Sequence, residues 1–279
     1  MEMTPAYPAL RLHWWKAVPN FGDALSALVV ARLSGRPVDH AGPAGADLFA
    51  IGSILQVVRR RYNSPRPDGV RPWIWGSGLL HSVPLDFLDN VRVALLRGPV
   101  TAALLGLKPR RFGDPGLLAG DLLGDRPTQD DRIGLVPHHK QADTPEIRAL
   151  VEREPALRLI HPGGDALDVC RQIAGCRHVI ASSLHGLVVA DACGVSSTWL
   201  SPGEESHLKY HDYAASIGRR MITPVPIGDI PDLLRGLRDG AALAHADGIE
   251  AARAALIETF PAELRAQAAP QTAVGDRNI

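Results

Sequence analysis

The chain has 279 residues, of which 30 are basic and 30 are acidic, and 46% of the residues are hydrophobic. This length suffices for about two domains of ordinary size, each with a buried core. The balanced charge argues against a nucleic-acid-binding protein, because affinity for a phosphate backbone needs a surplus of Lys and Arg. No apolar stretch reaches the roughly 18 residues that a membrane-spanning helix needs.

The N-terminus and the cysteines favour a cytoplasmic protein. Residues 1–5 contain no basic region followed by a long apolar run, so we expect no signal peptide. Cys170, Cys176 and Cys193 lack the spacing of metal ligands. We therefore expect them to be small buried thiols in a reducing compartment.

Short apolar strands alternate with helices along the whole chain, which is typical of parallel sheets covered by helices on both faces. In the first half, strands are expected at 10–15, 47–51, 72–75 and 91–95, and helices at 24–33, 54–61 and 100–105. In the second half, strands are expected at 132–136, 157–160, 178–181 and 195–200. Helices are expected there at 144–154, 165–174, 187–193, 230–237 and 240–260.

A polar, turn-rich segment at 124–131 separates the two halves and is the best candidate for a linker. The pattern therefore predicts two α/β domains that face a cleft. Their expected bounds are 1–125 for the N-terminal domain and 126–265 for the C-terminal domain with its last helices. Residues 266–279 are expected to form a flexible tail.

Four loops that follow predicted strands combine glycine with polar side chains, at 20–23, 76–78, 97–99 and 182–186. Ligands of such sheets bind beyond the carboxyl ends of the strands, where glycine and helix N-termini favour anions. Arg97 offers a bidentate donor, and His185 can donate a hydrogen bond or transfer a proton near neutral pH. The other predicted binding residues in these loops are Asn20, Gly22, Gly76, Ser77, Ser182 and Ser183.

Two further groups of basic residues lie outside these loops. His138 and Lys140 follow a predicted strand, where one of the adjacent histidines or Lys140 is expected to reach an anionic substrate. The adjacent His138 and His139 are expected to face opposite sides, which argues against a metal site. The basic run at 59–61 fits either a solvated helix end or a surface for an acidic saccharide or lipid phosphate. No Gly-x-Gly-x-x-Gly follows the first strand, so no dinucleotide cofactor is expected.

The ordered set of loops resembles the polysaccharide pyruvyl transferases. The segments 20–23, 75–78, 96–99, 112–116 and 182–186 occur in the order seen in that family. The segment 209–213, followed by 216–218, is similar to the part of the family after its last motif. The similarity covers roughly residues 10–220, and the set as a whole is more specific than any one motif.

This resemblance implies a glycosyltransferase-B-like pair of Rossmann-like domains. It also implies transfer of a pyruvyl group from phosphoenolpyruvate to a saccharide, usually giving a cyclic ketal, in polysaccharide or exopolysaccharide biosynthesis. Phosphoenolpyruvate is then the donor substrate, with no cofactor and no metal expected. The expected acceptor is a saccharide or a lipid-linked saccharide, through which the protein could contact a membrane peripherally.

The donor chemistry suggests roles for three residues. His185 is expected to contact the phosphate and to act as the acid, and Asp23 or Asp114 to serve the acceptor side. Asp114 precedes a proline, so a structural cap is the alternative for it. Family members often carry arginine where this chain has Ser183, so Arg97, Lys140 or another cation must replace it, or donor use differs.

Two other functions remain open at this point. The first is a glycosyltransferase of similar architecture that uses a nucleotide-sugar donor. The second is a relative that binds a saccharide without turnover, which the change at Ser183 makes conceivable.

Overall fold

The structure is a computed structural model that describes residues 7–125, 127–237 and 243–266. One residue of the predicted linker, the first residues of the predicted 240–260 helix and nearly all of the predicted tail lie outside this part. None of the described helices is long and apolar enough to cross a membrane.

The first half of the chain forms a five-stranded parallel sheet in the order β2-β1-β3-β4-β5. Two of its inner strands, β3 and β4, consist almost wholly of apolar, buried residues, as expected for a sheet covered on both faces. The strands are β1 (Leu10–His13), β2 (Val38–His40), β3 (Leu48–Phe49), β4 (Trp73–Ser77) and β5 (Arg92–Leu96). The helices are α1 (Phe21–Ser34), α2 (Leu55–Arg61) and α3 (Pro99–Leu104).

The second half forms a four-stranded parallel sheet in the order β7-β6-β8-β9. Its strands are β6 (Asp130–Val136), β7 (Leu157–Leu159), β8 (Cys176–Ala181) and β9 (Ser196–Trp199). Its helices are α4 (Pro145–Arg153), α5 (Ala166–Ala174), α6 (Leu184–Ala192), α7 (Leu208–Ser216) and α8 (Ile230–Gly236). The prediction of a mixed α/β protein with parallel sheets is confirmed.

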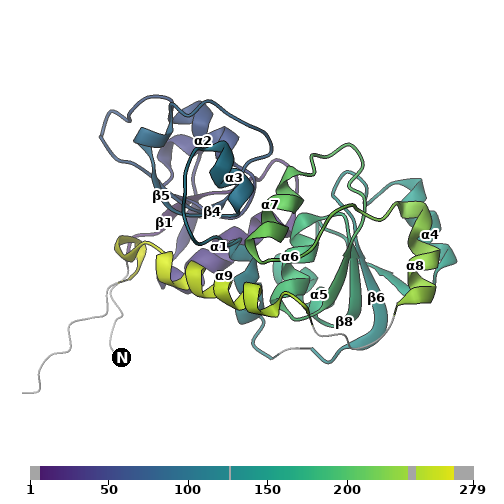
Figure 1. Cartoon of the computed structure of the whole chain (residues 1–279). Helices are drawn as coiled ribbons and strands as arrows, with labels where there is room; N and C mark the ends of the chain where they lie inside the picture. The colour runs from purple at the N-terminus through teal and green to yellow at the C-terminus, as the bar shows by residue number, and fades with distance from the viewer. Residues whose placement is uncertain (1–6, 126, 238–242, 267–279) are drawn as a thin grey trace, which may run out of the picture.

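The two sheets lie side by side and share packing (Figure 1). A 3₁₀ helix, η3 (Pro115–Leu122), packs against both α1 and α6, and one hydrophobic cluster contains residues of both halves. The last helix, α9 (Ala246–Thr259), returns to the first sheet, where the Trp75 indole donates to the Leu256 carbonyl at 3.1 Å. The division into two domains at 125/126, with a cleft between them, stays a prediction.

Two helices begin three residues earlier than expected, and both begin at a capping side chain. The Asn20 side chain accepts a hydrogen bond from the Gly22 N–H at 3.0 Å, so α1 starts within the segment expected to be a turn. Ser183 caps α6 by accepting from the Gly186 N–H at 3.3 Å. The first turns of α1 and α6 therefore contain the residues expected at the site.

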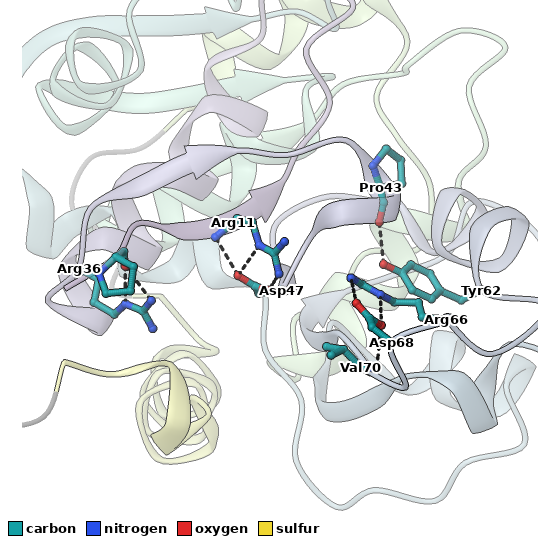
Figure 2. A network of polar contacts seen from close by, with 9 residues as sticks. Arg11, Arg36, Pro43, Asp47, Tyr62, Arg66, Asp68 and Val70 are labelled. Carbon is teal, nitrogen blue, oxygen red and sulfur yellow. Dashed lines mark hydrogen bonds and ion pairs between the residues drawn. The ribbon is translucent and has the colours of Figure 1, made fainter.

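Polar contacts join neighbouring segments in the first half of the chain (Figure 2). Arg11 on β1 pairs with Asp47, which precedes β3. Tyr62 follows the last residue of α2, and its hydroxyl donates to the Pro43 carbonyl at 2.7 Å. The second contact joins the end of α2 to the segment between β2 and β3.

Candidate active site

A cavity of about 560 Å³ lies where loops from both sheets meet. Its lining comes from segments that follow β1, β3 and β4 in the first sheet and β6, β8 and β9 in the second. Each of these segments follows the carboxyl end of a parallel strand, the end at which such sheets bind ligands. Of the predicted site residues, those that line the cavity are Asn20, Asp23, His138, Ser183 and His185.

His185 lies in the first turn of α6, and its ring is pressed against the first turn of α1. A Cβ atom at Gly22 would lie only 2.0 Å from Nδ1 of His185, so only glycine permits this approach. The N-termini of α1 and α6 therefore meet at the imidazole. Helix N-termini carry partial positive charge and unpaired N–H groups, so their meeting point favours an anion.

Gly116, whose N–H is capped by Asp114, lies near the opposite edge of the same ring. A Cβ at Gly116 would lie 3.1 Å from Oδ1 of Asp114 and 3.8 Å from Cδ2 of His185. Oδ1 accepts from the Gly116 N–H at 2.9 Å, which is the capping role given above as an alternative. Oδ2 of Asp114 and Nε2 of His185 are both buried and have no hydrogen-bond partner among the described residues.

Burial shifts the pKa values of both groups toward their neutral forms. Burial, together with the nearby charges of Lys209 and Arg97, lowers the pKa of His185 to about 3. It raises the pKa of Asp114 to about 6, although Arg97 acts in the opposite direction. At neutral pH the imidazole is therefore neutral, and a small fraction of the Asp114 carboxyl groups is protonated.

Asp23 lines the cavity one residue after Gly22. Burial raises its pKa to about 7, while the charge of Lys209 opposes that rise. A carboxyl group with a pKa near the working pH can both accept and return a proton. Asp23 is thus the cavity carboxyl best suited to general acid–base chemistry.

Lys209 is a lining residue that our sequence analysis did not single out. It lies in the first turn of α7, is largely buried, and has a pKa lowered by that burial. Its only ion-pair partner among the described residues is Glu205, at 4.0 Å. Lys209 belongs to the segment 209–213, which supported the family resemblance, but the sequence analysis assigned no chemical role to a residue of that segment.

Arg97 does not reach the cavity. Its guanidinium is fully buried, with Nε donating to Asp212 at 2.9 Å and one terminal nitrogen donating to the Leu79 carbonyl at 3.1 Å. The other terminal nitrogen donates to Ser53, which does line the cavity. Arg97 therefore contacts a residue of the cavity wall without lining the cavity itself. That Arg97 binds substrate directly stays a prediction.

His138 and His139 correct one expectation. Both line the cavity, and their ring centroids are 4.2 Å apart, so they do not face opposite sides. The reason is that β6 ends at Val136, and the alternation of a strand no longer applies after it. Burial lowers the pKa of His138 to about 4.

Lys140 lies outside the cavity wall. Its ammonium is mostly exposed and pairs with Glu205 at 2.6 Å. Within the described residues, no three His, Cys, Asp or Glu side chains are grouped so that they could hold a metal ion.

Three other predicted binding residues support the site from outside the cavity. A Cβ at Gly76 would lie 2.3 Å from Pro115, and φ there is +82°, so glycine is required for the close approach of η3. The Ser77 hydroxyl donates to the Ala50 carbonyl. The Ser182 hydroxyl donates to Gln141 and accepts from the His138 N–H at 2.8 Å, which fixes the turn that carries the histidines.

Comparison with known proteins finds a family to which part of the chain is similar. The model of the polysaccharide pyruvyl transferase family matches residues 85–204, which include Asp114 and His185. The succinoglycan biosynthesis protein ExoV of Rhizobium meliloti (strain 1021) is 30% identical over 178 residues, which are 61% of this chain and 54% of that protein. An uncharacterised protein of Acanthamoeba polyphaga mimivirus is 28% identical over 117 residues, covering 38% of this chain and 40% of its own.

A solved structure of an uncharacterised protein from Klebsiella pneumoniae subsp. pneumoniae NTUH-K2044 has a TM-score of 0.45 at 13% identity. That likeness covers 78% of this chain and 92% of the other. The curated relatives are matched over about half of their length or less. In its matched segment and its ordered motifs, the chain is similar to the polysaccharide pyruvyl transferase family.

Proposed function

We propose that this protein transfers a pyruvyl group from phosphoenolpyruvate to two hydroxyls of one saccharide, forming a cyclic ketal and releasing phosphate. One observation carries the proposal. His185 and Lys209 line the same cavity at the meeting point of two helix N-termini, in a chain that is similar to this family. The relative ExoV is named for succinoglycan biosynthesis, which agrees with a polysaccharide product.

The first task of such a site is to hold a small, highly charged donor. Phosphoenolpyruvate carries a phosphate and a carboxylate, so cations and N–H donors must surround it. Lys209 is the buried cation on the cavity wall, and it would take the place of the arginine that relatives often carry at Ser183. Each charge-assisted hydrogen bond contributes roughly 1.5–3 kcal/mol.

The second task is to move protons. Protonation of the donor's methylene carbon gives an oxocarbenium-like centre at C2, which the first sugar hydroxyl attacks. The bond from C2 to the phosphate oxygen then breaks, and the second hydroxyl adds to C2 to close the ketal. Of the two protons that the hydroxyls lose, one ends on the new methyl group and the other on the released phosphate, so none is consumed overall.

The residues around the cavity can perform this relay. Asp23, with a pKa of about 7, would accept a hydroxyl proton and return it within one turnover. The neutral His185 would donate a hydrogen bond to the donor phosphate. A bound trianion would raise the pKa of His185, because an opposite charge stabilises the imidazolium, and the ring could then act as the acid. Asp114 would hold the buried edge of that ring.

The test is phosphate release from phosphoenolpyruvate in the presence of candidate saccharides. His185→Ala should slow release by roughly 10²–10⁴-fold, the usual contribution of a general acid or base. His40→Gln, an exposed histidine outside the cavity lining, should retain the wild-type rate. The glycan product should gain the mass of pyruvate less one water. An unchanged rate in His185→Ala would remove this residue from the mechanism.

A thermal-shift screen separates the alternative donors. A ligand that binds only the folded state raises the melting temperature, and phosphoenolpyruvate should do so. A rise with a nucleotide diphosphate sugar instead would favour a glycosyltransferase. Saccharide binding without turnover of either donor would favour an inactive relative.

A further inference from the structure

The cavity extends well beyond the buried group around His185. Its outer wall comes from α2 and from the loop after β4, and Trp15 lies at its border from the segment between β1 and α1. A volume of about 560 Å³ falls within the range that encloses drug-sized ligands, whereas the proposed donor has only three carbons. The outer part therefore offers space for a second, larger substrate.

Trp15 is an exposed aromatic side chain in this outer part. Its exposed fraction is 46%, and among the described residues it makes no ring contact and no side-chain hydrogen bond. The neighbouring Trp14, in contrast, packs edge-on against His40, with ring centroids 4.6 Å apart. An exposed indole that borders a cavity offers a flat apolar surface, which is complementary to the apolar face of a sugar ring.

Arg60 supplies an available positive charge on the same wall. It is exposed, lines the cavity, and has no ion pair or hydrogen bond from its side chain within residues 7–125, 127–237 and 243–266. Its neighbour Arg59 is engaged, because it pairs with Asp86 at 3.1 Å. A free guanidinium can bind a phosphate or a carboxylate through two parallel hydrogen bonds.

The helix that carries Arg60 is fixed at several points. Arg59 joins it to Asp86, and Tyr62 closes its end by donating to Pro43 (Figure 2). The Gln56 carboxamide, oriented with its oxygen toward the loop after β4, accepts from two backbone N–H groups of that loop. The guanidinium therefore projects from a wall that is already held in place, which lowers the entropy lost on binding.

The two ends of the cavity differ in how far their side chains are buried. His185 and Lys209 are buried, whereas Trp15 and Arg60 are exposed. A small donor fits the buried end, and a saccharide that enters from solvent meets Trp15 and Arg60 first. From this arrangement we infer that Trp15 and Arg60 form the acceptor subsite, which takes a saccharide bearing an anionic group, either a phosphate ester or a carboxylate. The inference rests on the proposed function for the identity of the inner substrate.

Binding measurements with simple probes test the subsite without knowledge of the natural acceptor. The probes are glucose 1-phosphate, glucuronate, uncharged methyl glucoside and phosphoenolpyruvate, each titrated against the full chain by calorimetry. Arg60→Gln should weaken the preferred anionic sugar by about tenfold or more and leave methyl glucoside unchanged. Trp15→Ala should weaken all three sugars, and Trp15→Phe should restore part of the loss. Preference for glucose 1-phosphate or for glucuronate identifies the anion.

Arg61→Gln is the matched control, because this arginine is exposed on the same helix and lies outside the cavity lining. It should bind every probe as the wild type does. Equal losses in Arg61→Gln and Arg60→Gln would overturn the inference, and so would wild-type protein that binds no sugar or does not prefer an anionic one. The affinity for phosphoenolpyruvate should be unchanged in all variants. If wild-type protein binds sugars but not phosphoenolpyruvate, the proposed function fails while the subsite stands.

Discussion

Replacing the half-buried Asp23 by asparagine should make the protein more stable at neutral and alkaline pH. An acid whose pKa is higher in the folded state than in the unfolded state destabilises the fold as pH rises between those two values. For Asp23 the values are 3.8 and about 7, so the penalty is absent near pH 3 and complete above about pH 8. The full difference corresponds to about 4 kcal/mol.

Urea unfolding of wild type and Asp23→Asn at a series of pH values measures this directly. The free energies of unfolding should differ by less than about 1 kcal/mol near pH 4, and the variant should exceed the wild type by up to about 4 kcal/mol at pH 8. The same variant should lose transferase activity, a trade of stability for function that is common at active sites. A stability difference that is constant from pH 4 to pH 8 would refute the reasoning, because it would mean that Asp23 is not protonated more strongly in the folded state.

Three other substitutions test the supporting contacts. Gly22→Ala places a Cβ against the His185 ring and should slow turnover by about 100-fold. Gly228→Ala, with open space around it, should not change turnover. The measurement is the rate of phosphate release by each variant. Arg97→Met leaves Asp212 buried without its cation and should lower the free energy of unfolding, measured in urea, by about 3–5 kcal/mol. An unchanged free energy of unfolding would contradict the buried ion pair. Lys209→Met should weaken phosphoenolpyruvate binding, measured by calorimetry, by about tenfold or more. Lys140→Met is the control, because Lys140 lies outside the cavity, and it should bind phosphoenolpyruvate as the wild type does. Equal losses of affinity in the two variants would contradict the assignment of Lys209.

Much of the fold could be predicted because the apolar segments are short and regularly spaced. Asp165, the first residue of the helix expected at 165–174, is the cap of α5, and its side chain accepts from the N–H groups of Leu167 and Asp168. The three-residue β2 was missed, because so short an edge strand leaves almost no periodicity to detect. The 209–218 region was noted for its family motif, yet the helix α7 within it was not predicted.

The site was predicted in part, and the misses have physical causes. His185, Asp23 and Ser183 could be located from loop positions alone, since parallel strands bring such loops together. Arg97 also follows a strand, yet it does not line the cavity, because its guanidinium is held by Asp212, 115 residues later; its binding of substrate stays a prediction. Lys209 was missed for the converse reason, because only tertiary packing brings the start of α7 beside the strand-end loops.

The most direct test of the central claim is a crystal structure of the wild-type protein with phosphoenolpyruvate bound. The account predicts that the phosphate or carboxylate lies within hydrogen-bonding distance of the Lys209 ammonium and of the His185 ring, in the cavity that loops from both sheets line. Donor density elsewhere on the protein, with neither side chain in contact, would contradict it.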